Sequence, residues 1–258
     1  MSEDTYKKRE NKLFVILAGL FIANALIAEC VGVKIFSFEK FIGADPANLT
    51  IFGQSGLSFN MTAGVILWPV VFIMTDIINE YYGTKGVKFL SYLASGIITY
   101  AFLMFYIALS LPPADFWIGT GVEKGVPDMN LAFSSIFGQG LWIILGSITA
   151  FLIGQVLDVF VFHQIKKVTG EKMIWLRATG STLVSQLIDS FVVLFIAFYI
   201  GANWSLAFVL AVCAVNYIYK FTAAVVLTPV IYLVHGMIEK YLGHELADKM
   251  KKDALLSE

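Results

Sequence analysis

Two copies of the pattern Gln-x-x-Asp lie inside apolar stretches of this sequence: Gln155 with Asp158, and Gln186 with Asp189. Residues three positions apart share one face of a helix, so each motif presents an amide and a carboxylate side by side. An ionised carboxylate at the centre of a membrane helix costs about 2.5–3.5 kcal/mol on insertion scales, so it must face protein, water or a ligand. The two motifs therefore predict a functional site inside a membrane.

Other polar side chains in the apolar stretches extend this candidate site. Asn216 and Lys220 are four residues apart on one helical face, and Lys220 can neutralise either Asp158 or Asp189. Some of this polarity is expected to hold helices together, because Asn, Gln, Ser and Thr form hydrogen bonds between membrane helices. One lysine, however, cannot neutralise all of the acids. The substrate-binding candidates are Asp76, Asn79, Gln155, Asp158, Ser185, Gln186, Asp189, Asn216 and Lys220.

Aromatic and charged residues form a second group of candidates. An aromatic side chain can stack on a flat ligand, although aromatics in membrane helices more commonly pack against one another. The stacking candidates are Tyr217, Tyr219 and Phe160. The candidates for coupling or gating are Glu29, Glu80 and Arg177. Arg177 is interpreted first as an anchor at the cytoplasmic membrane surface and second as a gate.

The elements that would position these residues are membrane-spanning helices. The 258 residues are 58% hydrophobic and 14% charged, with a mean hydropathy of +0.78, outside the range of soluble domains. Apolar stretches of about 20 residues are long enough to cross a bilayer. We predict one all-α, polytopic domain covering 1–258, with cytoplasmic tails at 1–12 and 238–258 and six spans at 13–35, 61–82, 88–111, 134–163, 178–200 and 205–235.

The distribution of basic residues sets the expected orientation. Fourteen of the 18 Lys and Arg residues lie before the first span, at the turn between the second and third, between the fourth and fifth, or after the sixth. The segments 36–60 and 112–133 hold only Lys40 and Lys124. Because basic residues accumulate on the cytoplasmic side, we predict a multi-pass protein of the plasma membrane with both termini inside.

The two outer segments are apolar for loops. Alternating residues at 36–39 and 49–52, around Gly43 and Pro46, predict a small hairpin or a flap on the membrane surface. Segment 112–130 is expected either to lie in the membrane interface or to act as a lid. The third span carries no charge after Lys88, so it would face lipid or a partner subunit, and a homodimer is considered.

Metal, cofactor and nucleic-acid chemistry are not predicted. Cys30 and Cys213 lie in apolar stretches, and the chain has no His-Glu-x-x-His or Cys-x-x-Cys pattern. A net charge of −1 gives no reason to expect a nucleic-acid partner. The expected partners are a small molecule and the lipid bilayer.

Four separate intramembrane motifs resemble those of the queuosine precursor transporters, a family formerly grouped with vitamin uptake proteins. They are WPVVFIMTD at 68–76, GQVLDVFVF at 154–162, STLVSQLIDS at 181–190, and NYIYK at 216–220 together with TPVIY at 228–232. The resemblance covers the second to the sixth span in order. It implies inward transport of 7-deazaguanine bases (queuine, preQ0 or preQ1) that are used to modify tRNA. A guanine-like ring presents an N–H beside an amino group, two donors that a buried carboxylate can accept together.

Two other classes of function are open alternatives. A substrate-binding membrane subunit of an ATPase-coupled vitamin importer has a similar size, but the cytoplasmic half of the first span lacks an Ala-x-x-x-Ala docking pattern. An intramembrane enzyme is disfavoured, because the spans contain no Gly-x-Gly-Asp and no Ser/His pair. The two Gln-x-x-Asp motifs run in opposite directions, which suggests an inverted repeat with the site near the membrane midplane. An unpaired acid could couple a proton.

Overall fold

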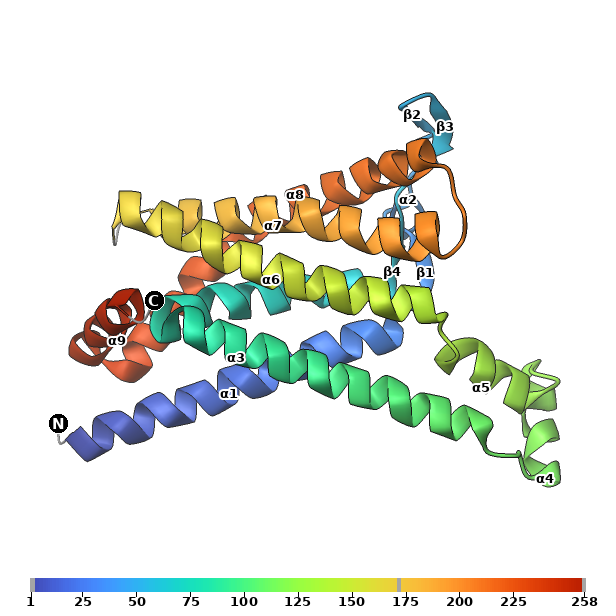
Figure 1. The fold of residues 1–258 in the computed structure, drawn as a ribbon, viewed down its shortest axis with the longest axis horizontal. Coiled ribbons are helices and arrows are strands. Elements are labelled where there is room, and N and C mark those ends of the chain that lie inside the picture. Colours follow the sequence, from blue (N-terminus) through green and yellow to red (C-terminus); the bar gives the residue numbers. More distant parts are fainter. Residues whose placement is uncertain (1–2, 171–172, 257–258) are drawn as a thin grey trace.

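Long helices run roughly along one axis of the molecule, and short strands lie at one end (Figure 1). The computed structural model describes residues 3–170 and 173–256. The long helices are α1 (Glu3–Val31), α3 (Trp68–Ser110), α6 (Leu141–Thr169), α7 (Ile174–Leu194) and α8 (Leu206–Leu242). Within the described ranges, five helical segments are long and apolar enough to cross a membrane. The prediction of an all-α, polytopic membrane protein is confirmed.

Helix α3 reverses direction at Gly83, where φ is 67° and ψ is −171°. This backbone conformation is essentially restricted to glycine. Thr75 Oγ1 and Ser91 Oγ both donate to Oε1 of Gln155, at 3.2 and 3.4 Å, although a straight helix would place them roughly 24 Å apart. The arms 68–82 and 84–110 therefore lie side by side (Figure 1). They correspond to the second and third predicted spans, while six crossings and two inside termini stay predictions.

Several helix boundaries differ from the predicted ones. Helix α1 begins at Glu3, inside the expected tail, and ends at Val31, and the chain enters a strand by Ile35. The second predicted span begins late, because 61–67 form a strand and a 3-10 turn before the helix starts at Trp68, with a proline in its first turn. The fourth predicted span is broken at 138–140 (Gly-Gln-Gly) into α5 (Met129–Phe137) and α6.

The C-terminal half also continues beyond the predicted spans. Helix α7 passes into a π-helical turn, η3 (Phe195–Ile200), and α8 extends to Leu242. Helix α9 (His244–Leu256) then packs against α3 and buries Leu246, Ala247 and Met250. The region predicted as a cytoplasmic tail thus includes a helix packed on the bundle, and its location in the cytoplasm stays a prediction. Its apolar residues recur every three or four positions and cover the core, which a count of its charges does not reveal.

A flap of short elements connects α1 to α3. It comprises β1 (Ile35–Ser37), α2 (Phe38–Phe41), β2 (Leu49–Ile51), β3 (Gln54–Leu57), β4 (Asn60–Thr62) and η1 (Ala63–Ile66). The antiparallel pairs are β1 with β4 and β2 with β3, so the two stretches expected to share one hairpin belong to different sheets. Phe52 and Gly53 cause this pairing: their φ values of 50° and 76° form a tight turn that folds β2 onto β3.

The flap is held by contacts to α8 and by one buried acid. Leu57 of β3 packs against Ala211 and Val215 of α8. Glu39 is 4% exposed, and its Oε1 accepts the backbone N–H of Phe59 at 2.7 Å. The flap is therefore fixed to the end of the bundle at which α8 begins.

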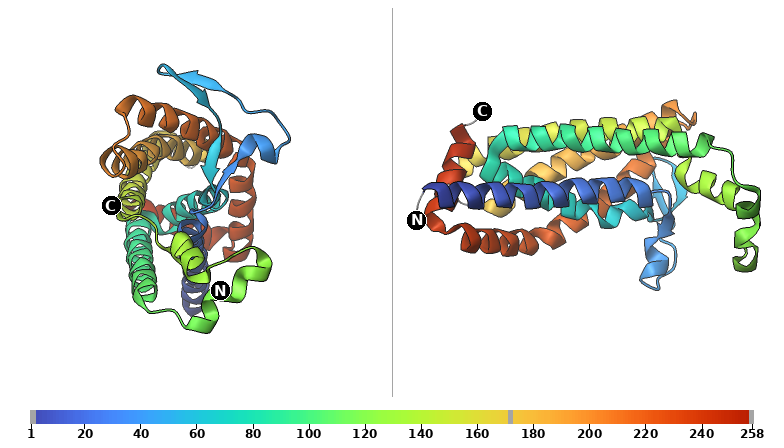
Figure 2. Two further views of the ribbon diagram at one scale, coloured as in Figure 1. Left: turned by 90° about the vertical axis from the view of Figure 1, so that its right-hand side faces the viewer. Right: turned by 90° about the horizontal axis from the view of Figure 1, so that it is seen from below.

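The other outer segment projects from the same end of the bundle, on the opposite side from the flap (Figure 2). It contains α4 (Asp115–Ile118), η2 (Gly119–Lys124) and α5. Phe105 of α3 contacts Phe137 of α5, with their ring centroids 4.9 Å apart, and Phe116 is 83% exposed. None of this segment's residues line either of the cavities described below. Its expected role as a lid stays a prediction.

Candidate functional site

Helices α6 and α7 pack antiparallel and bring the two Gln-x-x-Asp motifs to the same level of the bundle. A Cβ atom on Gly154 would lie 3.5 Å from the Asp189 Cβ, and one on Gly146 would lie 3.1 Å from the Val193 carbonyl oxygen. These glycines let the helices approach closely. Ser185 Oγ donates to Asp158 Oδ1 at 3.1 Å across the interface. The predicted convergence of the two motifs on one place is thus what the structure shows.

A cavity of about 250 Å³ lies at this level, and we call it the inner cavity. The polar side chains that line it are Gln155, Asp158, Ser185, Gln186 and Asp189, and the remaining lining residues are Trp68, Phe72, Phe151 and Gly154. Both motifs therefore face the inner cavity. The amide of Gln155 is oriented by Thr75 and Ser91, which donate to its oxygen.

Two acceptor atoms in the inner cavity are buried and unused. Asp158 Oδ2 and Gln186 Oε1 have no hydrogen-bond partner in the part of the chain that the structure describes. Both side chains are about 5% exposed. Leaving a buried polar group unsatisfied costs about 1–3 kcal/mol, and more when it is charged. A ligand with paired N–H donors would supply the missing partners.

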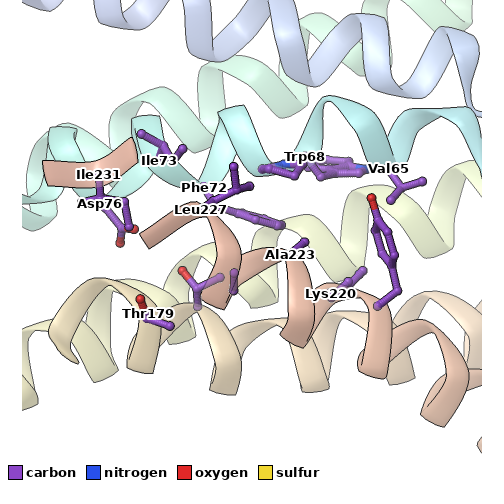
Figure 3. Close-up of a pocket in the computed structure, with 14 residues that line it drawn as sticks. Val65, Trp68, Phe72, Ile73, Asp76, Thr179, Lys220, Ala223, Leu227 and Ile231 are labelled. Carbon is purple, nitrogen blue, oxygen red and sulfur yellow. The ribbon is translucent and has the colours of Figure 1, made fainter. Parts of the chain in front are cut away.

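A second cavity, of about 510 Å³, adjoins the inner cavity, and we call it the long cavity (Figure 3). Trp68 and Phe72 line both cavities. The wall is mostly apolar, with Asp76 toward one end and Lys220 toward the other (Figure 3). The rest of its lining is Val65, Pro69, Ile73, Thr179, Thr182, Tyr219, Ala223, Ala224, Leu227 and Ile231.

Lys220 pairs with Asp189 and thereby links the two cavities. The distance from Lys220 Nζ to Asp189 Oδ2 is 2.6 Å, and each side chain is about one-fifth exposed. Of the two acids that the sequence offered as partners, Lys220 contacts Asp189 and leaves Asp158 to Ser185. Asp158 is therefore the more available carboxylate for a ligand.

The aromatic residues at the site are largely not the predicted ones. Trp68 and Phe72 are stacked, with ring centroids 6.1 Å apart and planes 19° apart. Among the stacking candidates, Tyr219 lines the long cavity, whereas Phe160 is 59% exposed on the outside of the bundle, so its expected role is wrong. Tyr217 lines neither cavity and donates to the Leu183 carbonyl at 3.1 Å. The missed signal was the spacing of four between Trp68, Phe72 and Asp76, which places them on one face.

A buried ion cluster lies at the end of the bundle where α3 turns and α7 begins. Arg177 donates from Nε and Nη2 to the two oxygens of Glu80, at 3.1 and 2.7 Å, and Lys166 Nζ lies 3.1 Å from Glu80 Oε2. Arg177 is 1% exposed, so the interpretation of it as a surface anchor is wrong. Beside the cluster, His163 Nε2 is 2.8 Å from Asn79 Oδ1. Asn79 and Glu80 thus serve this cluster and line neither cavity.

Two further candidates lie outside the cavities. Asn216 donates to the Val212 carbonyl of its own helix at 3.1 Å, so it does not join the substrate-binding set. Glu29 of α1 accepts a hydrogen bond from Ser147 of α6, which places it between helices. Within the described ranges, no three His, Cys, Asp or Glu side chains gather to hold a metal ion.

Comparison with known proteins supports a transport role for these cavities. Residues 62–234 match the model of a protein family described as "Putative vitamin uptake transporter". The chain is 31% identical over 187 residues to a "Probable queuosine precursor transporter" of Bacillus subtilis, covering 70% of this chain and 75% of that protein. It is 28% identical over 206 residues to the "Queuosine precursor transporter" of Escherichia coli, covering 77% of this chain and 82% of that protein.

A third relative, a "Probable queuosine precursor transporter" of Haemophilus influenzae, is 25% identical over 156 residues, 60% of each chain. No solved structure matches the chain. The matched residues 62–234 contain all of both cavities' linings. The chain therefore belongs to the vitamin uptake transporter family, and it is a multi-pass transporter of the plasma membrane rather than an enzyme.

Proposed function

We propose that this protein imports 7-deazaguanine queuosine precursors, such as queuine, preQ0 or preQ1, into the cytoplasm for tRNA modification. The observation that carries the proposal is the pair of unused acceptors, Asp158 Oδ2 and Gln186 Oε1, in a cavity bordered by Trp68 and Phe72. The names of the related proteins support the same class of cargo.

The chemistry of the ring complements this set of groups. The ring N–H and its neighbouring amino group are parallel donors, and a carboxylate such as that of Asp158 accepts both in a bidentate arrangement. The ring carbonyl accepts a hydrogen bond from an amide or from the Lys220 ammonium group. The flat ring stacks on Trp68, which adds apolar burial to the polar recognition. Of the two candidate carboxylates Asp158 and Asp189, Asp158 is then the one that binds the ring, and Asp189 pairs with Lys220.

The expected orientation assigns the two ends of the bundle to the two sides of the membrane. With both termini inside, the flap lies toward the outside and the Glu80 cluster toward the cytoplasm. Glu80, Lys166 and Arg177 join α3, α6 and α7 below the cavities, so this cluster acts as the closed inner gate. Release of cargo then requires these ion pairs to separate or exchange partners. Glu29, bound to Ser147, is the candidate for a coupled proton.

Ligand binding to the purified protein tests the site. Titration calorimetry with queuine, preQ0, preQ1 and guanine compares the native chain with Asp158→Asn. We expect the substitution to weaken each base that binds by about 10- to 100-fold, because one charge-assisted pair of hydrogen bonds is lost. Phe160→Leu is the matched control on the same helix, and it should leave affinity unchanged. Equal affinities for Asp158→Asn and the native chain would contradict the site assignment.

Uptake of labelled base into proteoliposomes tests direction and coupling. Lys220→Ala should slow uptake, because Asp189 loses its counter-charge at the junction of the two cavities. An imposed inward proton gradient should accelerate uptake if Glu29 couples a proton, and Glu29→Gln should remove that acceleration. Equal rates with and without the gradient would rule out proton coupling. The alternative, an ATPase-coupled subunit, requires uptake to depend on ATP and a second protein.

A further inference from the structure

Asp76 is a buried acid that takes no part in the proposed recognition of the ring. It lines the long cavity, and its side chain is 2% exposed. Oδ1 of Asp76 has no hydrogen-bond partner in the described part of the chain. In Figure 3 its carboxylate points toward the space enclosed by the lining residues. Such an acid in a membrane protein faces a ligand, an ion or water.

The charges around Asp76 do not supply a counter-ion by direct contact. Its electrostatic neighbours are Asp158, Glu80 and Arg177. Two of these are acids, and the Arg177 guanidinium is already bound to Glu80 and to the Gly170 carbonyl, to which its Nη1 donates at 2.9 Å. No salt bridge to Asp76 occurs among the described residues. Asp76 therefore has no charged partner in direct contact, and a bound cation would supply one.

The basic side chain that lines the long cavity, Lys220, is paired with another acid. Lys220 lines the long cavity toward its far end and forms an ion pair with Asp189 at 2.6 Å. The cavity wall between Asp76 and Lys220 is largely apolar, with Thr179 and Thr182 among its few polar side chains. The long cavity is thus a largely apolar space with a carboxyl group toward one end, and Asp76 Oδ1 has no hydrogen-bond partner among the described residues.

We propose that Asp76 forms a separate subsite that binds a protonated amine on the side arm of the cargo and selects cationic over neutral cargo. This rests on the function proposed above. A ring held in the inner cavity by Asp158 lies beside Trp68 and Phe72, where the two cavities adjoin. An arm on that ring enters the long cavity, and its amine reaches the Asp76 carboxylate. Asp76 is then a specificity-determining residue, because it contacts the group in which related bases differ.

A matched pair of ligands isolates this contact. PreQ1 carries a protonated aminomethyl arm, and preQ0 carries an uncharged nitrile on the same ring. Affinities of both are measured for the native chain, Asp76→Asn, Asp76→Glu and Asp158→Asn. We expect Asp76→Asn to weaken preQ1 by about 10- to 100-fold, the effect of losing a charged hydrogen bond, while preQ0 changes by less than about threefold. Asp76→Glu, which keeps the charge, should keep the preference for preQ1, and Asp158→Asn should weaken both bases.

The outcomes separate this proposal from the proposed function. If Asp76→Asn weakens both bases equally, or weakens neither, Asp76 does not select the arm and the proposal is overturned, whereas the function stands as long as the native chain binds both. If the native chain binds neither base, the proposed function itself fails. The measurements are repeated in sodium and in choline buffers. If tight binding of both bases requires sodium in the native chain and not in Asp76→Asn, the cation at Asp76 is inorganic, which also overturns the proposal.

Discussion

Replacing Glu80 by Gln should destabilise the protein more than any conservative change on its surface. Glu80 is fully buried and is the acid that both Arg177 and Lys166 contact, at 2.7 and 3.1 Å. Glu80→Gln keeps the shape of the side chain but leaves two buried cations without this counter-charge. Breaking a buried ion pair costs about 3–5 kcal/mol. For a chain of this length that corresponds to a fall in melting temperature of roughly 6–20 °C.

Intrinsic fluorescence of the detergent-solubilised protein measures this change, because the chain contains five tryptophans. The matched control is Glu123→Gln in the exposed outer segment, which should change stability by less than about 0.5 kcal/mol. Arg177→Gln should also destabilise. The double variant, Glu80→Gln with Arg177→Gln, should lose less stability than the two single variants lose together, because both single changes disrupt the same contact.

The reasoning fails if Glu80→Gln melts within the range of the Glu123→Gln control. That result would mean that the charges of the cluster are hydrated or neutral in the membrane-embedded protein. Strict additivity of the two single changes would refute the pairing of Glu80 with Arg177 in particular.

Three further predictions concern other parts of the fold. Gly83→Ala should lower the free energy of unfolding by about 1–3 kcal/mol, because a Cβ atom strains the turn of α3. The same melting assay measures this change, and an unchanged melting temperature would contradict the strain. Trp68→Ala should weaken base binding by about 1–3 kcal/mol in calorimetry, whereas Phe160→Ala should not, and equal effects would contradict stacking in the cavity. Burial raises the pKa of Glu39, but hydrogen bonds led by that from the Phe59 N–H outweigh this effect and hold the pKa below its usual value. The stabilisation of the flap by Glu39 is then present above about pH 4.3 and is lost as the pH falls through the lowered pKa. Limited proteolysis of the flap should therefore accelerate at low pH in the native chain, and Glu39→Gln should already be cleaved faster at neutral pH and gain less on acidification.

Much of the helical fold follows from the sequence because apolar length and the positions of charges are direct consequences of the bilayer. The details that could not be predicted are set by tertiary contacts. The strand pairing of the flap depends on the backbone conformation of Phe52 and Gly53, and α9 depends on a partner surface on α3. The reversal of α3 at Gly83 agrees with the expected turn between two spans, but its sharpness depends on one φ angle.

The polar part of the site was predictable for a similar reason. A carboxylate or amide in an apolar helix must face protein, water or a ligand, which is why Gln155, Asp158, Gln186 and Asp189 were expected at one site. The same rule also selected Asn79 and Asn216, whose hydrogen bonds go to His163 and to the Val212 carbonyl instead. Aromatic residues need not face protein or water, because their side chains are stable both in the protein core and in lipid. Trp68 at the cavity and Phe160 on the outer surface therefore look alike in the sequence, and only the packing distinguishes them.

The contacts of α9 determine which parts of the transporter can move together. This helix packs on α3 and returns to α8 through the ion pair of Lys251 with Glu239, and the Lys251 ammonium group also lies 5.6 Å from the centre of the Tyr81 ring. Helix α9 therefore connects α8 to the arm 68–82 of α3. A motion that opens the cavities would then move α6 and α7 together, away from α3 and α8. The ion pairs of Glu80 and Asp189 join these two groups of helices, so they would have to break during the motion.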